Sequence, residues 1–511
     1  MRTLRCLLFA GLAFVFVVMP AAADPGHVGL AQGAVRGEKL GTVHFEISCG
    51  ADAERAFDHA VALLHSFQYE DAERGFAALA AADTTCAMAY WGVAMCNYHP
   101  IWGPTTQADF DRGRTAAERA QSVGAKTERE RDYVEAIASY YQRSDSLDFP
   151  ARKAAYESAM QRLHARFPDD MEGTIFYALA ILGVAPANDR TYAKQRQAAA
   201  LLNAVLPKAP KHPGVAHYLI HSLDYPPLAE LALSAARAYS KIAPASPHAQ
   251  HMPSHVFTRL GLWEESIQSN LASAEAAHRL MERTHPGAMS FDGLHAMDYL
   301  TYAYLQTGKE ALAKEVVDMV QGVTELDQQT FSAAYAFAAV PARYALECHD
   351  WAGAAQLTVA PAWFQWSKFP WAEALTQFSK GVGAARTGDL AAARTALARL
   401  DTLHTAVTGV KAGYDWAPQV EVQRQALEGW IAHAEHREDD AIARLQAAAD
   451  LEDSTDKHPV TPGALLPARE QLGDLFMELG RKAEAAAAYE IVLKTSPGRR
   501  NSMLGLKVAK S

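Results

Sequence analysis

Long apolar runs and catalytic signatures are both scarce in this chain of 511 residues. Beyond residue 23, no segment approaches the roughly 18 uninterrupted apolar residues of a membrane-spanning helix. The sequence also lacks a Gly-rich phosphate loop, a nucleophile elbow and a dinucleotide fingerprint. These absences argue against a membrane span after the first 23 residues, and they leave any reaction without a standard sequence signature.

Basic residues and cysteines are also few. The 48 Lys and Arg residues are outnumbered by 58 Asp and Glu residues, which gives a formal net charge of −10. A nucleic-acid partner requires a basic face, so this balance argues against one. Five cysteines without a CxxC pair also argue against a cysteine-based metal site.

The first 23 residues predict a secretory signal peptide. Arg2 and Arg5 form a basic start, followed by an apolar stretch over Cys6–Met19. Ala21–Ala23 then offers a small-residue cleavage site. A membrane anchor is the alternative, but the run is short and the cleavage site follows at once. We therefore expect a soluble mature chain that begins at Asp24 and is periplasmic or secreted.

Such an oxidising compartment permits disulfides. Cys49, Cys86, Cys96 and Cys348 lie beyond the signal peptide. We predict a bridge between Cys49 and Cys86, which would tie the N-terminal segment to the first helical pair. Free buried thiols remain the alternative, because cysteine also packs as a small apolar side chain.

A repeating pattern of small, aromatic and turn residues is clearest near the C-terminus. Gly473 and Ala485 would let two helices approach closely, and Tyr489 would fill the space between them. Gly480 suits a tight turn, and Pro497 stops the second helix. This order matches the tetratricopeptide (TPR) spacing, and weaker copies recur through most of the chain. The sequence therefore predicts an all-α, TPR-like solenoid of helical hairpins, an α-α superhelix with a concave inner face.

We divide the chain into four parts. Residues 1–23 are the signal peptide, and 24–50 lack helical periodicity and predict an extended arm. Residues 51–345 form an N-terminal TPR-like solenoid, and 346–511 form C-terminal TPR repeats. A coiled coil is disfavoured because the apolar pattern changes face every ~15 residues and follows no single heptad seam.

Histidine is concentrated in the middle of the chain. Of the 20 histidines, nine lie within residues 212–295. With 3.6 residues in each turn, His217, His221 and Asp224 share one narrow stripe of a helix. These side chains therefore point in one direction if the segment is helical.

Two further pairs share a helix face. His251 and His255 are four residues apart, and His295 and Asp298 are three apart. Imidazoles on adjacent turns can chelate one ion, as helical histidine pairs do in zinc proteins. Each pair therefore predicts part of a metal site.

The spacing between these pairs follows the repeat. The separations from His217 to His251 and from His221 to His255 are both 34 residues, the TPR period. The two pairs thus occupy equivalent places on successive first helices. Three consecutive hairpins are predicted to direct imidazole and carboxylate groups at one inner region.

The predicted metal ligands are His217, His221, Asp224, His248, His251, His255, His295 and Asp298. Imidazole with carboxylate suits a transition metal ion, with Zn, Cu and Fe all open. Eight ligands exceed one tetrahedral site, so two ions, or one ion with an outer layer of histidine and aspartate, both remain open. A histidine-lined site without metal and purely structural histidines are the alternatives.

The histidine motifs also carry a resemblance. The segments Leu63–Phe67, Cys86–Gly92, His212–Asp224, Pro247–Gly261 and His295–Leu300 resemble a family of exported bacterial TPR proteins with a His-rich signature. The resemblance covers most of the mature chain. It implies the fold and the compartment, and it implies no reaction, because no activity is settled for that family.

Three functions follow from these patterns. The first is a periplasmic protein that binds a transition metal on its concave face, with storage, delivery and metalloenzyme catalysis all open. The second is an interaction scaffold that binds a partner peptide in the TPR groove. The third is a small-molecule hydrolase or lyase that uses histidine and aspartate alone.

Overall fold

The computed structural model describes residues 39–50, 53–142, 146–187, 189–410 and 413–511. Every regular element in these ranges is a helix, apart from one isolated bridge between Met289 and Leu326. The predicted signal peptide and residues 24–38 of the predicted arm lie outside the described residues. The prediction of an all-α, TPR-like array of helical hairpins is confirmed.

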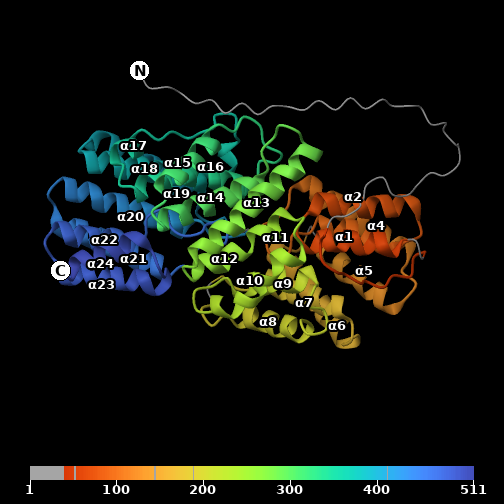
Figure 1. Cartoon of the computed structure of the whole chain (residues 1–511). Helices are drawn as coiled ribbons and strands as arrows, with labels where there is room; N and C mark the ends of the chain where they lie inside the picture. The colour runs from red at the N-terminus through yellow and green to blue at the C-terminus, as the bar shows by residue number, and fades with distance from the viewer. Residues whose placement is uncertain (1–38, 51–52, 143–145, 188, 411–412) are drawn as a thin grey trace, which may run out of the picture. The chain divides into compact units, whose positions relative to one another are not determined.

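The helices follow one another as hairpins along the chain (Figure 1). The first group comprises α1 (Glu54–His65), α2 (Tyr69–Ala82), α3 (Ala87–Cys96), α4 (Gln107–Val123), α5 (Glu128–Tyr141), α6 (Phe149–Arg166), α7 (Met171–Gly183) and α8 (Ala193–Val205). The middle group comprises α9 (Pro213–Leu223), η1 (Ala229–Ala232), α10 (Leu233–Ile242), α11 (Pro247–His251), α12 (Pro253–Arg259), α13 (Trp263–Thr284), α14 (Phe291–Gln306) and α15 (Glu310–Gln321).

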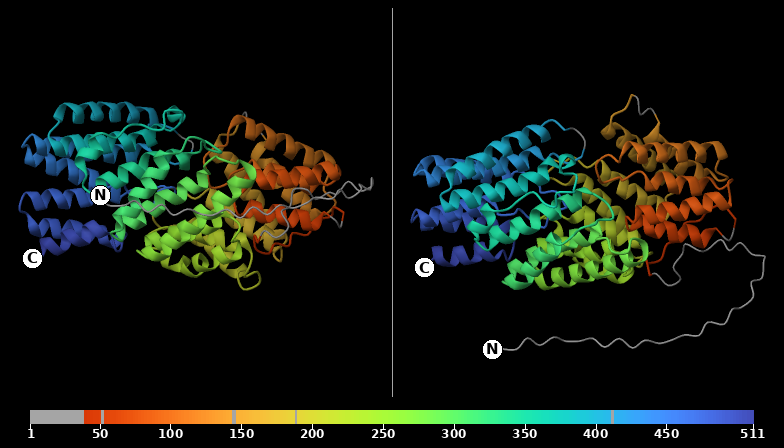
Figure 2. Two further views of the ribbon diagram at one scale, coloured as in Figure 1. Left: turned by 45° about the horizontal axis from the view of Figure 1, so that its top comes forward. Right: turned by 90° about the horizontal axis from the view of Figure 1, so that it is seen from above.

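The remaining helices complete the array, and consecutive helices again lie side by side in both views of Figure 2. They are α16 (Phe331–Glu347), α17 (Trp351–Ala355), η2 (Trp366–Lys368), α18 (Pro370–Thr387), α19 (Leu390–Val407), α20 (Ala417–Ala434), α21 (Glu438–Asp453), α22 (Ala468–Glu478), α23 (Lys482–Thr495) and α24 (Arg500–Ala509).

Small residues set the close approach of paired helices. A Cβ atom on Gly473 would lie 2.7 Å from the ring of Tyr489, and one on Gly92 would lie 2.2 Å from the ring of Phe76. Both distances are too short for a side chain, so glycine is what allows the aromatic ring to fill the hairpin. Gly480 turns the chain between α22 and α23 at a φ of 72°.

The middle hairpins place the histidines. Helices α9, α11 with α12, and α14 are first helices, and they pack against the second helices α10, α13 and α15. Pro253 begins α12, so α11 and α12 are one helix interrupted at Met252. Gly261 and Gly308 turn the chain at φ values of 68° and 72°. Gly261 thus lies between α12 and α13, and Gly308 lies at the matching place between α14 and α15.

Residues 39–50 contain no helix and are nonetheless held in the core. The Phe45 ring is fully buried, and its centroid lies 5.3 Å from that of Phe57 and 4.9 Å from that of Tyr133. The predicted disulfide between Cys49 and Cys86 is present, with Cα atoms 5.4 Å apart. The disulfide and the aromatic cluster therefore attach this segment at two points.

The apolar core forms two clusters. One draws on residues 40–257 and the other on residues 267–509. Helices α11, α12, α13 and α14 contact one another where these clusters meet. The domain boundary predicted between residues 345 and 346 stays a prediction. Within the described ranges, no helix is long and apolar enough to span a bilayer.

One connection in the C-terminal repeats is long and contains no helix. Helices α21 and α22 are joined by residues 454–467, whereas α22 and α23 are joined by residues 479–481. The long connection is called the 454–467 segment below. Its side chains Val460, Thr461 and Leu466 are each at most 5% exposed. A long structureless connection that is also buried is uncommon, which indicates a specific role.

The disulfide should contribute measurably to stability. Replacing both Cys49 and Cys86 with alanine should lower the free energy of unfolding by roughly 3–4 kcal/mol, because the bridge restricts the unfolded chain. Urea unfolding under oxidising conditions measures this loss, with Cys348→Ala as the control for removing a thiol outside the bridge. Equal stabilities of the double variant and the control would contradict the prediction.

Candidate metal centre

Six of the eight predicted ligands converge as two groups of three histidines. Helix α9 supplies His217 and His221, and α11, α12 and α14 supply the others. In each group, one ring nitrogen from every histidine lies within 4.8 Å of the other two. The groups are His217, His221 and His248, called the first triad, and His251, His255 and His295, called the second triad.

The first triad is centred on His217. Its Nε2 atom lies 3.0 Å from Nε2 of His221 and 3.0 Å from Nε2 of His248. His217 is fully buried, whereas His221 and His248 are partly exposed. The Phe67 ring packs against all three, with centroid distances of 4.4–5.7 Å. One side of this triad therefore faces solvent beside an aromatic ring.

The second triad lies beside the first. Nε2 of His251 is 3.0 Å from Nε2 of His255, and the His251 and His295 ring centroids are 4.2 Å apart. The rings of His248 and His251, which belong to different triads and to one helix, have centroids 6.5 Å apart. The six imidazoles thus form one continuous group across three hairpins.

Hydrogen bonds on the Nδ1 side orient two of these rings. His217 Nδ1 donates to the carbonyl oxygen of His65 at 2.6 Å, since that oxygen can only accept. His251 Nδ1 lies 2.7 Å from Oδ1 of Asn270. The Asn270 amide nitrogen donates to Ser266 O at 2.8 Å, which assigns Oδ1 as the acceptor. In both neutral rings the proton is therefore on Nδ1, and Nε2 carries a lone pair.

Asp224 orients a third ring. Its Oδ2 atom accepts a hydrogen bond from His255 Nδ1 at 2.9 Å, and its Oδ1 atom accepts one from Arg259 Nε at 2.9 Å. The arginine keeps the pKa of the buried Asp224 carboxyl well below its usual range, although burial opposes this. The Nε2 atoms of His251 and His255, 3.0 Å apart, consequently both present lone pairs.

The six imidazoles are not expected to become protonated in order to remove the repulsion between facing lone pairs. Burial lowers the pKa of all six histidines, because a charged imidazole loses its hydration there. The neighbouring imidazoles lower five of these pKa values further. The group therefore offers neutral nitrogen ligands, the form in which histidine binds metal ions.

The second predicted carboxylate ligand, Asp298, belongs to neither histidine triad. Its Oδ1 atom is 3.4 Å from Nε of Arg343, and its buried Oδ2 atom has no hydrogen-bond partner among the described residues. Burial raises the pKa of Asp298 to about 6. Neither Asp224 nor Asp298 joins a group of three ligand atoms, and direct coordination by either one stays a prediction.

The sequence pattern did not mark three residues that shape this centre. Asn270 lies on the second helix α13, and Arg259 ends α12, so neither shares the histidine spacing. Phe67 follows α1 and has a φ of 57°, a conformation that a bulky residue rarely adopts. Phe67 and Arg259 lie within segments that carry the family resemblance, but the resemblance assigned no role to either.

A third group of potential ligands has a different character. Nε2 of His65 and Nε2 of His212 donate to the two carboxylate oxygens of Glu172, at 2.9 and 2.8 Å. Tyr218 OH donates to Nδ1 of His65 at 2.9 Å. Ordinary hydrogen bonds thus account for these distances, unlike the lone pairs that face each other in the second triad. This buried group supports His65, whose carbonyl oxygen orients His217.

No model of a known protein family matches the chain, and no curated protein matches it. Similar solved structures include the human IFIT1 dimer with m7Gppp-AAAA, at 12% identity and a TM-score of 0.37, covering 79% of this chain and 86% of that one. Yeast Tom70 is 11% identical with a TM-score of 0.32, covering 90% and 95%. The TPR domain of P58(IPK) is 10% identical with a TM-score of 0.22, covering 90% and 98%. Similarities this low carry no argument about function.

Removing the charge of Glu172 should destabilise the protein. The two histidines hold the pKa of this buried carboxyl below its usual value of 4.5, against the effect of burial. The unfolded state therefore binds more protons than the folded state at low pH. The stability that ionised Glu172 contributes to the fold is consequently lost as the pH falls below 4.5.

We expect Glu172→Gln to lower the free energy of unfolding by about 3 kcal/mol at neutral pH, because one imidazole N–H loses its acceptor. The exposed Glu128→Gln is the matched control. Urea unfolding between neutral and acidic pH should show a smaller loss of stability below pH 4.5 in Glu172→Gln than in the native chain. Parallel pH curves would refute this role.

Proposed function

We propose that this protein is an exported helical-repeat protein that binds two transition metal ions, one at each histidine triad. The observation that carries the proposal is the 3.0 Å separation between Nε2 of His251 and Nε2 of His255. Both rings commit their Nδ1 proton to an acceptor. Two facing lone pairs repel each other, and a cation bound by both nitrogens removes that repulsion.

The donor set supports zinc most directly and leaves iron and copper as outcomes of metal analysis. Neutral imidazole suits all three metals. Two imidazole nitrogens on a tetrahedral zinc ion lie roughly 3.3 Å apart, so the observed 3.0 Å requires little movement. Three histidines leave one position of a four-coordinate ion free. Catalytic zinc sites share this arrangement, so each ion could activate a water molecule.

The compartment belongs to the proposal as well. Disulfides persist in oxidising compartments, and the Cys49–Cys86 bridge is consistent with export. Periplasmic or secreted localisation also follows from the sequence of the first 23 residues.

An interaction scaffold is the second candidate, and the TPR-like fold favours it. Such folds bind extended segments on their inner face. Here the 454–467 segment makes contacts of that kind within the chain. Arg343 donates to the carbonyl oxygens of Gly463 and Ala464 at 3.1 and 2.8 Å. A scaffold function would therefore use a different part of the inner face or displace this segment.

Metal content tests the proposal directly. The native protein, purified without a histidine tag and loaded with zinc, should contain close to two ions per chain by elemental analysis. His217→Ala and His251→Ala should each retain one ion, because each variant loses the ligand that contacts the other two histidines of its triad. The double variant should retain none.

His278→Ala is the matched control, since His278 is exposed on α13 outside both triads. It should bind as much zinc as the native chain. A folded native protein that never retains metal would refute the proposal and leave the scaffold as the function. Loss of helical circular dichroism in the alanine variants would be checked separately.

Asp224 should control the affinity of the second triad without holding the ion. In the His217→Ala background, Asp224→Asn should weaken zinc binding by about 10–100-fold, because the Nδ1 proton of His255 loses its charged acceptor. Competition with a chromophoric chelator measures the dissociation constant. Asp318→Asn, a change at an exposed aspartate on α15, is the control. An unchanged dissociation constant would show that Asp224 has no such effect.

A further inference from the structure

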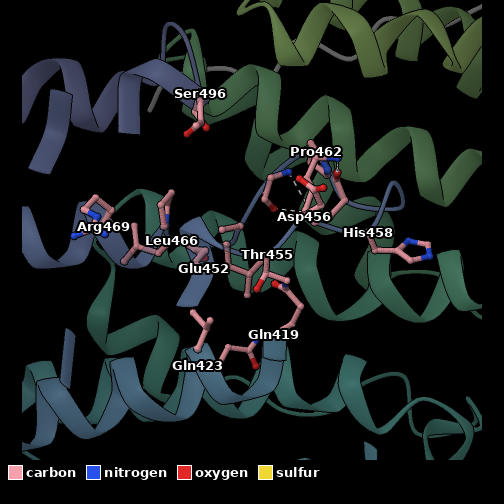
Figure 3. Close-up of a pocket in the computed structure, with 18 of the residues that line it drawn as sticks. Gln419, Gln423, Glu452, Thr455, Asp456, His458, Pro462, Leu466, Arg469 and Ser496 are labelled. Atoms are coloured by element: carbon pink, nitrogen blue, oxygen red, sulfur yellow. Dashed lines mark hydrogen bonds between the residues drawn. The ribbon is translucent and has the colours of Figure 1, made fainter. Parts of the chain in front are cut away.

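A cavity of about 190 Å³ lies between the 454–467 segment and helices α18 and α20. Figure 3 shows Gln419 and Gln423 on one side and Thr455 and Asp456 facing them from the segment. Its volume corresponds to roughly six water molecules, enough for a small organic molecule. None of the six histidines of the two triads lines it.

Lys457 places an ammonium group on the wall of this cavity. Its Nζ atom donates to the carbonyl oxygen of Thr461 at 2.6 Å, and an ammonium group has two further protons to donate. No carboxylate of the described residues forms an ion pair with it within 4.0 Å. Burial lowers the pKa of Lys457 to about 7 and Arg259 lowers it further, while the more distant carboxylates of Asp224, Asp298 and Asp456 only partly offset this.

The other cations around the cavity are already paired. Arg190 contacts Asp456, and Arg259 contacts Asp224. Arg469 contacts Asp450 and Asp453 at 2.6 and 2.7 Å. The carboxyl of Glu452, which also lines the cavity, accepts a hydrogen bond from Ala468 N at 2.7 Å. Burial raises the pKa of Glu452 to about 7, so it supplies only part of a charge.

Aromatic rings form the apolar part of the wall. The Trp371 and Trp416 rings stack at a centroid distance of 3.9 Å, and Tyr335 lies beside them. The cavity thus combines a flat aromatic surface with one ammonium group that no carboxylate of the described residues contacts directly. These two features are complementary to a negative charge and to a planar apolar body.

We infer that this cavity is a binding site for a small organic carboxylate, whose anionic group pairs with Lys457 and whose body lies against the aromatic wall. This site is distinct from the two metal ions and does not require them. A bound carboxylate would place an anion in direct contact with the Lys457 ammonium, and the paired charges are more favourable there than either charge alone.

Two chains of contacts connect this site to the second triad. Arg259 lines the cavity and donates to Asp224, which accepts from His255. Thr461 also lines it, and its carbonyl oxygen accepts from Tyr299 OH at 3.2 Å. The Tyr299 ring stacks on His255 with centroids 4.8 Å apart. In each chain of contacts, one further residue therefore separates the cavity wall from His255, a proposed metal ligand.

Three probes of one shape test the charge requirement. We would titrate the full mature chain with 4-fluorobenzoate, 4-fluorobenzamide and 4-fluorobenzylamine and follow fluorine NMR line widths. The benzoate should bind at millimolar concentration and the other two at least tenfold more weakly, because only the benzoate supplies an anion to Lys457. The result should hold for both the metal-free and the zinc-loaded protein.

Variants of Lys457 test the site itself. Lys457→Met should weaken benzoate binding at least tenfold, Lys457→Arg should retain most of it, and the exposed Lys482→Met should leave it unchanged. Circular dichroism would establish that each variant is folded. Equal binding of the three probes, no binding of the benzoate, or full binding by Lys457→Met would overturn the inference. None of these outcomes bears on the metal content, so the two proposals fail separately.

Discussion

The hydrogen bond made by Nδ1 of an imidazole determines whether its Nε2 atom can bind a metal ion. His217, His251 and His255 each donate their Nδ1 proton to an acceptor that cannot return one. Each neutral ring is thereby left with a lone pair on Nε2, and packing holds those lone pairs close together. Without the acceptors, tautomer exchange would let one ring donate to another, and an ordinary histidine hydrogen-bond network would satisfy the site. The acceptors thus convert a polar cluster into a set of ligands.

The helical repeat brings these histidines together using ordinary helical hairpins. Successive hairpins place corresponding helix faces next to one another, so histidines on one first helix can meet histidines on the next. His217 of α9 meets His248 of α11, with their Nε2 atoms 3.0 Å apart, and His248 lies about one helical turn before His251, the repeat equivalent of His217. Burial at the junction of two apolar clusters then keeps the imidazoles neutral. A centre built from several hairpins also depends on the packing between them.

The repeat explains which features could be predicted from the sequence. Helical faces and the hairpin period are local properties, and they marked the six histidines as candidate ligands, whereas the Cys49–Cys86 pair was predicted from the expected compartment and the few cysteines. The partners on the Nδ1 side could not be found in this way, because Asn270 lies on a second helix and the His65 carbonyl comes from α1. The roles of Asp224 and Arg259 depend on the same long-range packing. Periodicity placed Asp224 on the histidine stripe but could not show that it lies behind His255.

The 454–467 segment packs in the second apolar cluster, and its Asp456 also contacts Arg190 from the connection between α7 and α8. Tyr299 from α14 donates to the carbonyl oxygens of Pro459 and Thr461, and Arg343 from α16 donates to the next residues of the segment. Helices α14 and α16 therefore bind backbone carbonyls of an extended segment of their own chain. Because Tyr299 also stacks on His255, movement of the segment would change the packing around the second triad. The long insertion is thus better explained as a wall shared by the cavity and the histidine centre than as a connection between two helices.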